Sequence, residues 1–333
     1  MGRKANILLI TTGGTLASAP SENGGLSPQL SGEEILAHIP EIRNIADIRT
    51  LPLMNIDSTN MAPSKWLKIS LLIEEQYPFY DAFVITHGTD TLAYTAAALS
   101  YLIQNSPKPI VLTGSQQAIA LRDTDARKNL SDALLYAADP EACGVKVVFD
   151  GQVMIGTRVR KTHTKSYRAF SSIDYPNVAM ISNQKIYHFI SEKPRGPLKF
   201  YHHLDSNIAI LKLVPGLQPE FMLNLGRGAK ALIIEGFGSG GLPNLPSWDL
   251  AAAARQLLAE GKILLMSTQV QHEGSDMAVY EVGSSLRRLP GMMEAFTLTA
   301  EALVCKMMWI LAQSDEPETV RNLLYKKIDH DLL

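Results

Sequence analysis

The sequence contains only two cysteines, Cys143 and Cys305, which lie far apart and form no CxxC motif. This pattern argues against a disulfide framework and favours two buried thiols in a reducing compartment. No run reaches the roughly 18 to 20 apolar residues that a membrane helix needs. The first apolar run, 5–10, is short and ends in Thr-Thr-Gly-Gly, which is not typical of a signal peptide. We therefore predict a cytoplasmic protein that does not associate with a membrane.

Clusters of positive charge are also missing. The 31 Lys and Arg residues are scattered among 33 Asp and Glu residues, and the net charge is −2, so nucleic acid is not an expected partner. No His, Cys and Asp cluster has the spacing of metal ligands, and no Gly-Lys-Ser/Thr of a phosphate-binding loop is present. We expect neither a metal nor a cofactor.

The chain does show a regular alternation of strand and helix patterns, and its 333 residues favour two domains. In the first part, β-branched runs alternate with helical patterns, and Asp150-Gly151 separates two such runs as a two-residue hairpin turn. This alternation predicts a mostly parallel sheet covered by helices on both faces. The predicted strands are 7–11, 83–86, 109–113, 145–149 and 152–155, and helices are expected after Ser31, along the face of Trp66, Ile69 and Ile73, and over 124–137.

Periodicity is lost over 191–207, which we interpret as a linker between an N-terminal domain, 1–190, and a C-terminal domain, 208–333. Beyond the linker the alternation resumes on a smaller scale. Strands are predicted at 208–213, 231–234 and 263–267, and the chain ends in helical patterns at 298–312 and 318–325.

The most informative segment is 86–91, Thr-His-Gly-Thr-Asp-Thr, between an apolar run and an Ala-rich helical pattern. Its polar residues are expected at the carboxyl end of a strand, where open α/β sheets bind ligands. Asp90 could simply cap the following helix, and we interpret His87 as a packed or supporting imidazole. The adjacent hydroxyl and carboxylate of Thr89 and Asp90 at a strand end indicate a role in catalysis or binding rather than in packing of the core.

Other polar segments share this position but are less specific. Thr11-Thr12-Gly13-Gly14-Thr15 ends the first strand, and its glycines permit a tight turn and close backbone approach to a ligand. Taken alone it could equally be an ordinary turn in which Thr15 is a capping hydroxyl. Residues 57–59 could cap a helix or hold a small zwitterion. The segment 113–116 is a further polar strand end, and the basic segment 158–163 is of a kind that is usually solvated.

Together these segments resemble the bacterial-type L-asparaginases (asparaginase/glutaminase superfamily), and within them the cytoplasmic type I branch. The resemblance covers essentially the whole chain, and its signatures at 12–15 and 87–91 are highly specific as a pair. It implies a two-domain α/β fold with a larger, mostly parallel N-terminal sheet that carries a β-hairpin and a smaller Rossmann-like C-terminal domain. The implied activity is hydrolysis of free L-asparagine to L-aspartate and ammonia, with weak glutaminase activity.

The resemblance also implies roles for individual residues. Thr15 is the expected nucleophile, and Thr89, Asp90 and Lys161 are expected to form a second catalytic triad. A homodimer or a homotetramer (a dimer of dimers) is implied, in which a neighbouring subunit could contribute Thr268 and Glu301. The residues expected to bind the substrate are Asp57, Ser58, Thr59, Gly88 and Ser115.

The chain departs from this family at two places. Many members carry a tyrosine on the loop after the nucleophile, where this chain has Gly24-Gly25-Leu26. Either another residue or water would then assist Thr15, while the loop 17–28 could act as a lid with glycine hinges. Relatives with an allosteric asparagine site have Thr, Arg and Cys where this chain has Arg160, Glu235 and Val270, so that regulation is not expected.

The residue types suit amide hydrolysis. A covalent route needs an activated hydroxyl, a proton path to ammonia and donors for an oxyanion. Lys161 could act as a base only if it is partly desolvated, and Asp90 would orient its amine toward Thr89. Backbone N–H groups at the glycine turns could serve as the oxyanion donors.

Two other functions are compatible with the fold. The amidase subunit of a tRNA-dependent amidotransferase shares it but normally carries an additional N-terminal β-domain, whereas the first strand here begins at about residue 6. A non-catalytic module that binds an amino acid or a nucleotide is the third possibility, although a binding module has no need of two candidate nucleophiles and a lysine.

Overall fold

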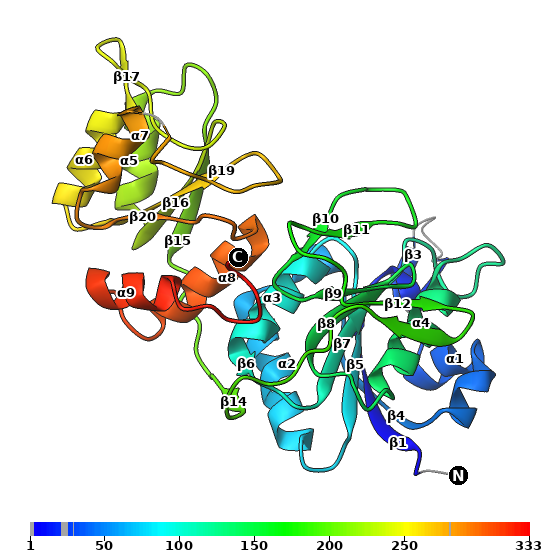
Figure 1. The fold of residues 1–333 in the computed structure, drawn as a ribbon. Helices are drawn as coiled ribbons and strands as arrows, with labels where there is room; N and C mark the ends of the chain where they lie inside the picture. Colours follow the sequence, from blue (N-terminus) through cyan, green and yellow to red (C-terminus); the bar gives the residue numbers. More distant parts are fainter. Residues whose placement is uncertain (1–2, 21–25, 29, 280) are drawn as a thin grey trace. The chain divides into compact units, whose positions relative to one another are not determined.

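The computed structural model describes residues 3–20, 26–28, 30–279 and 281–333. The chain forms two compact units, which divide between His202 and His203 (Figure 1). This division falls inside the predicted linker 191–207. That segment is not wholly irregular, because it contains the short strand β14 (Lys199–Phe200), which pairs with β6 (Ile103–Gln104).

The first unit is built on an eight-stranded sheet with the order β13-β12-β9-β8-β7-β5-β1-β4. The strands from β8 to β4 in this order are parallel, and β9, β12 and β13 are joined to them antiparallel. The sheet is therefore mostly parallel, as predicted. Its strands are β1 (Ala5–Gly13), β4 (Ala46–Ile56), β5 (Ala82–Thr86), β7 (Pro109–Thr113), β8 (Gly144–Phe149), β9 (Gln152–Ile155), β12 (Ala179–Ser182) and β13 (Lys185–His188).

The predicted hairpin joins β8 to β9. Asp150 and Gly151 have φ angles of 48° and 73°, the left-handed values that a two-residue hairpin turn of this type requires. The strand β4, in contrast, was not predicted. It lies at the edge of the sheet and exposes Asp47 and Arg49, so it lacks the continuous apolar run of the central strands.

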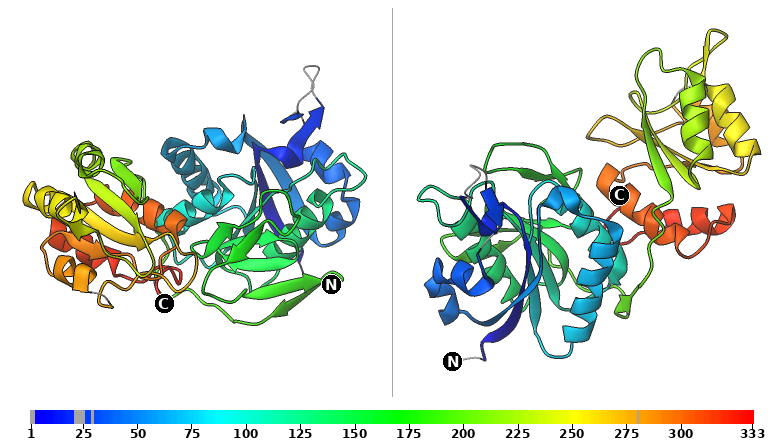
Figure 2. Two further views of the ribbon diagram at one scale, coloured as in Figure 1. Left: turned by 90° about the horizontal axis from the view of Figure 1, so that it is seen from above. Right: turned by 180° about the vertical axis from the view of Figure 1, so that it is seen from behind.

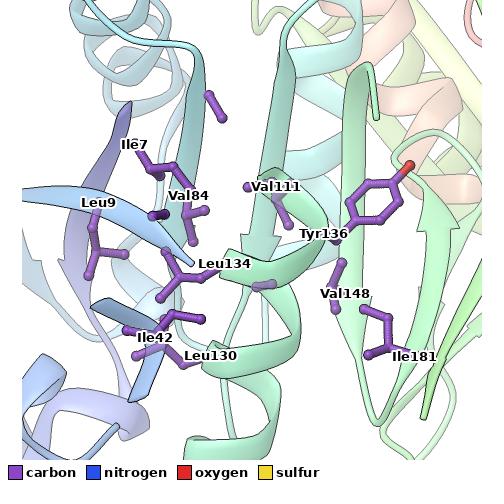
Figure 3. Close-up of a cluster of buried hydrophobic side chains, with 14 of the residues drawn as sticks. Ile7, Leu9, Ile42, Val84, Val111, Leu130, Leu134, Tyr136, Val148 and Ile181 are labelled. Carbon is purple, nitrogen blue, oxygen red and sulfur yellow. The ribbon is translucent and has the colours of Figure 1, made fainter. Parts of the chain in front are cut away.

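Helices cover both faces of this sheet (Figures 1 and 2). Helices α1 (Gly32–Ala37) and α4 (Ala126–Ala137) lie on one face, and α2 (Pro63–Gln76) and α3 (Leu92–Leu102) lie on the other. Leu130 and Leu134 of α4 pack with Ile7, Val84 and Val111 of the strands in one buried cluster (Figure 3). Burial of these side chains fixes the strands whose ends carry the polar segments.

The local signals read from the sequence are confirmed. Ser31 and Glu34 form a capping box at the start of α1, and Trp66, Ile69 and Ile73 form the buried face of α2. The short elements of this unit are η1 (Thr15–Ala17), β2 (Ser18–Pro20), β3 (Leu26–Pro28), η2 (Pro40–Asn44), η3 (Ser58–Asn60), β10 (Val159–Lys161) and β11 (Phe170–Ser172).

The second unit has a four-stranded parallel sheet with the order β15-β16-β19-β20. Residues of the sheet, α5 and α6 share one core, which includes Leu211, Leu232, Met222 and Leu257. This is the smaller α/β unit that the sequence predicted. Its elements are β15 (Ile208–Lys212), α5 (Pro219–Arg227), β16 (Ala231–Gly236), β17 (Asn244–Leu245), β18 (Trp248–Asp249), α6 (Leu250–Ala259), β19 (Ile263–Thr268), α7 (Glu281–Arg287), β20 (Met292–Glu294), α8 (Ala300–Leu311) and α9 (Pro317–Leu324).

A buried ion pair lies near the end of the chain in this unit. Lys306 of α8 lies 2.6 Å from Asp331, and both side chains are fully buried. Lys306 Nζ also donates to the carbonyl oxygen of Lys326 at 2.8 Å. Burial lowers the pKa of Lys306, and Asp331 opposes this effect. Across the described ranges of both units, no helix is long and apolar enough to traverse a bilayer.

Candidate active site

Four neighbouring parallel strands of the first unit, in the order β7-β5-β1-β4, end at one edge of the sheet. Thr86, at the end of β5, is in register with Thr11 of β1 on one side and Thr113 of β7 on the other. Each of the polar segments that follow these strands was predicted to contribute to the site. Their common edge is where an open α/β sheet binds its ligand.

Glycines allow the turns after these strands to touch. Gly13 and Gly14 have φ angles of 98° and 80°, which residues with a Cβ rarely adopt. A methyl group on Gly14 would lie 2.5 Å from the nitrogen of Gly88, and one on Gly88 would lie 2.6 Å from Ser58 Oγ. The turns that follow β1 and β5 are therefore in direct contact, and the 3-10 helix η3 lies against the second of them.

Thr15 begins the 3-10 helix η1 immediately after these glycines, and it is half-buried. The N-cap residue of η1 is Gly14, and no side chain caps this helix. The interpretation of Thr15 as a capping hydroxyl is therefore wrong. Ser18, the residue after η1, stabilises this turn, because its hydroxyl donates to the carbonyl oxygen of Gly14 at 3.0 Å.

Thr89, Asp90 and Lys161 form a connected group. Lys161 Nζ donates to Thr89 Oγ1 at 2.8 Å and to Asp90 Oδ1 at 2.6 Å. Lys161 ends β10, which pairs with β11, so the hairpin delivers the amine to a motif 72 residues earlier in the chain. Thr89 is buried, whereas the side chain of Asp90 is 56% exposed.

The alternative role of Asp90 as a helix cap is wrong. The N-cap residue of α3 is Thr91, and no side chain makes a capping hydrogen bond there. Thr91 instead donates its hydroxyl to the carbonyl oxygen of Ser58 at 2.7 Å. The motif after β5 is thus tied to η3 on one side and to Lys161 on the other.

Asp57, Ser58 and Thr59 lie at the end of β4. Asp57 Oδ1 accepts hydrogen bonds from the Thr59 amide at 2.8 Å and from the Thr59 hydroxyl at 2.9 Å. Asp57 thereby caps the 3-10 helix η3, whereas the N-cap residue of α2 is Ala62. Asp57 and Thr59 are exposed and Ser58 is buried beside Gly88.

Ser115 lies on the turn after β7 and is buried. Its hydroxyl donates to the carbonyl oxygen of Gln117 at 2.5 Å. Asp125 accepts hydrogen bonds from the amides of Gln116 and Gln117 and holds the same turn. Burial raises the pKa of Asp125, and these hydrogen bonds oppose the rise. No pattern in the sequence indicated this role, because Asp125 is linked to backbone amides rather than to another motif.

His87 is fully buried beneath the site. Its Nδ1 lies 2.7 Å from the carbonyl oxygen of Gly88, and its Nε2 lies 2.9 Å from Thr95 Oγ1. Burial lowers its pKa to about 4. The prediction of a packed, supporting imidazole is confirmed.

The remaining predicted residues do not belong to these turns of the first unit. Thr268 and Glu301 belong to the second unit, where both are buried and Thr268 Oγ1 donates to the carbonyl oxygen of Gly238 at 2.6 Å. The predicted lid, 17–28, includes the paired strands β2 and β3, but its proposed hinges Gly24 and Gly25 lie outside the described residues. Among the residues that the structure describes, no group of His, Cys, Asp and Glu side chains could hold a metal ion.

Comparisons with known proteins match both units. The family model described as "Asparaginase, N-terminal" matches residues 6–194, and that described as "Glutaminase/Asparaginase C-terminal domain" matches 207–324. An L-asparaginase of Thermococcus kodakarensis is 38% identical over 327 residues, which are 97% of each chain. A glutamyl-tRNA(Gln) amidotransferase polypeptide of Pyrococcus abyssi is 31% identical over 96% of this chain and 74% of its own length.

Solved structures agree with these sequence matches. The structure of the thermostable L-asparaginase from T. kodakarensis superimposes with a TM-score of 0.91 at 36% identity, and the match covers 98% of this chain and 99% of that one. That of L-asparaginase I from Vibrio cholerae gives a TM-score of 0.87 at 29% identity, over 99% and 100% of the two chains.

Proposed function

The chain belongs to the asparaginase family, and we propose that it hydrolyses free L-asparagine to L-aspartate and ammonia through a threonine nucleophile. The observation that carries this proposal is the contact of Lys161 with both Thr89 and Asp90. The backbone contact between Gly14 and Gly88 supports it. A nucleophile on one turn and a proton-transfer group on the other suit a covalent route to amide hydrolysis.

In the proposed reaction, Thr15 Oγ1 attacks the side-chain carboxamide carbon of asparagine. The resulting tetrahedral intermediate collapses as the C–N bond breaks, a proton reaches the nitrogen, and ammonia leaves an aspartyl ester on Thr15. Water then attacks the ester, releases aspartate and returns the proton to Thr15. Backbone N–H groups at the glycine turns stabilise the oxyanion in both steps.

The Thr89–Lys161–Asp90 group moves the protons. Lys161 Nζ lies within hydrogen-bond distance of both neighbours, so a proton that leaves Thr89 has a direct route to the amine. Asp90 holds the amine beside Thr89 and supplies a compensating negative charge. General-base catalysis of this kind contributes about 10²- to 10⁴-fold in rate.

The amino-acid end of the substrate is proposed to bind at Asp57, Ser58, Thr59 and Asp90, with Gly88 and Ser115 completing the site. The carboxylates of Asp57 and Asp90 are suited to an α-ammonium group, and the hydroxyls and turn amides to an α-carboxylate. Glutamine differs from asparagine by one methylene, and such a difference is worth only about 1 to 3 kcal/mol. We therefore expect weak glutaminase activity.

The assembly, location and domain limits are further parts of the proposal. Resemblance to the family supports a homodimer, or a homotetramer built as a dimer of dimers, in which a neighbouring subunit contributes Thr268 and Glu301. The two cysteines, which lie far apart and form no CxxC motif, support a cytoplasmic location. The loss of periodicity supports domains at 1–190 and 208–333 joined by the linker 191–207.

Ammonia release from a panel of L-asparagine, L-glutamine, D-asparagine and short peptides tests the function. We expect the highest kcat/KM with L-asparagine. Thr15→Ala and Thr89→Val should each abolish turnover, and Thr319→Val in α9 serves as a matched control that should retain it. Full activity in both site variants would defeat the proposal, and ammonia release that depends on charged tRNA would favour the amidotransferase alternative.

A further inference from the structure

A chain of hydrogen bonds runs from the helix layer to the turn that carries Thr89. It starts at Trp66 of α2, whose Nε1 donates to Thr95 Oγ1 of α3 at 2.9 Å. It continues from Thr95 Oγ1 to His87 Nε2 at 2.9 Å and from His87 Nδ1 to the carbonyl oxygen of Gly88 at 2.7 Å. Trp66, Thr95 and His87 are buried, with exposed fractions of 5%, 0% and 0%.

The chemistry of these groups sets one direction for every hydrogen in the chain. An indole nitrogen only donates, so Thr95 Oγ1 accepts from Trp66. The carbonyl oxygen of Gly88 only accepts, so His87 carries its hydrogen on Nδ1, and the Nε2 of the neutral ring accepts the hydrogen of Thr95 Oγ1. Burial holds the pKa of His87 near 4, so the neutral ring with this single tautomer persists at neutral pH.

The last bond fixes a peptide plane next to the catalytic group. All peptide bonds in the described residues are trans, so the carbonyl of Gly88 and the N–H of Thr89 point in opposite directions. With the carbonyl held against the buried ring, the Thr89 N–H points away from it. Among the described residues, no backbone carbonyl accepts a hydrogen bond from that N–H, which leaves it available to a bound ligand.

We propose that Trp66, Thr95 and His87 are positioning residues that orient the Gly88–Thr89 peptide so that the Thr89 N–H faces the reacting carboxamide. This role rests on the proposed amide hydrolysis. A preorganised donor aimed at the developing oxyanion is worth about 10²- to 10³-fold in kcat when it is removed. Loosening its support should therefore lower kcat by at least about tenfold and leave KM almost unchanged.

The central test replaces Thr95. Thr95→Val keeps the shape of the side chain but removes the hydroxyl that donates to His87 Nε2 and holds the ring in place, so kcat should fall about tenfold or more while KM stays within about twofold. Thr95→Ser restores the hydroxyl and should restore kcat. Ser100→Ala is the matched control, because it removes another buried hydroxyl from α3, one that donates to the carbonyl oxygen of Ala96 in the same helix.

A spectroscopic readout separates positioning from general damage. In protein labelled with 15N-histidine, we expect His87 to be the Nδ1-protonated tautomer in the wild type and a mixture of tautomers in Thr95→Val. Ammonia release by the wild type, and its loss in Thr89→Val, tests the proposed function first. An Nε2-protonated ring in the wild type, or a Thr95→Val enzyme with wild-type kcat, would then overturn the positioning role alone. A loss of kcat shared equally by Ser100→Ala would overturn it too.

Discussion

Replacement of Gly14 by alanine tests whether contact between the two turns sets the geometry of the site. The backbone at Gly14 has φ 80° and ψ 178°, a conformation that costs a residue with a side chain about 1 to 3 kcal/mol. The added methyl group would also lie 2.5 Å from the nitrogen of Gly88 and 2.6 Å from its Cα. Since carbon atoms pack at about 3.5 Å or more, the turns must separate by about 1 Å.

A displacement of this size affects catalysis more than folding. A misplacement of about 1 Å can lower the rate about 100-fold, so Gly14→Ala should lose about two orders of magnitude in kcat and about 1 to 3 kcal/mol in stability. Gly261→Ala is the matched control. Its φ is 79°, but a methyl group there would meet nothing within 4 Å, so it should lose stability and keep kcat.

The assays are steady-state ammonia release and urea unfolding of both variants. A Gly14→Ala enzyme with wild-type kcat would refute the reasoning, because the turns would then not need to touch. An equal loss of kcat in Gly261→Ala would refute it as well, because backbone strain outside the motif would then be sufficient.

Three further predictions concern charged groups. Lys161→Met should lower kcat about 10²- to 10⁴-fold. It should change the free energy of unfolding by less than about 1 kcal/mol, because the ion pair of Lys161 with Asp90 is partly exposed. Steady-state kinetics and urea unfolding check this, and a loss of stability as large as the loss of transition-state stabilisation would contradict it. Lys306→Met should cost about 3 to 5 kcal/mol because it leaves Asp331 buried without its counter-ion. The double variant Lys306→Met/Asp331→Leu should regain much of that loss in urea unfolding, and a single variant no less stable than the double would oppose this account. His87 has a pKa of about 4 in the folded chain and an ordinary value of 6.5, so the unfolded chain binds the proton first as the pH falls. The contribution of His87 to the free energy of unfolding is present above pH 6.5 and is lost as the pH falls from 6.5 toward 4, by about 2 kcal/mol at pH 5. In urea unfolding at a series of pH values, His87→Asn should lack this part of the dependence of stability on pH. An unchanged dependence would show that His87 does not titrate in this way.

The sequence predicted the central strands well because burial on both faces gives them continuous apolar runs, as in β5 and β7. The edge strands carry weaker signals. β4 alternates between exposed and half-buried residues and includes Pro52, and β13 has no fully buried residue. An edge strand makes contacts on one side only, so its sequence is constrained less.

The candidate site also combines predictable and unpredictable features. The polar segments at the strand ends were predictable because their position follows from the strand pattern. The contact of Lys161 with Thr89 was not derivable from spacing, since 72 residues and a hairpin separate them, and it was expected only from the family resemblance. The role of Asp125 in holding the turn after β7 was not predicted, because Asp125 accepts hydrogen bonds from backbone amides. Every residue type except proline offers such an amide, so no sequence pattern identifies these partners.

The two edge strands of the large sheet, β4 and β13, affect how readily the protein aggregates. An unprotected edge strand exposes unpaired N–H and C=O groups, which can pair with strands of other chains and start aggregation. Here β4 carries exposed Asp47, Arg49 and Pro52, and β13 is only four residues long and begins with exposed Lys185. Charged side chains, proline and short length are features by which natural proteins prevent the pairing of edge strands between molecules. We therefore expect this unit to remain monodisperse at concentrations at which a sheet with unprotected edges would aggregate.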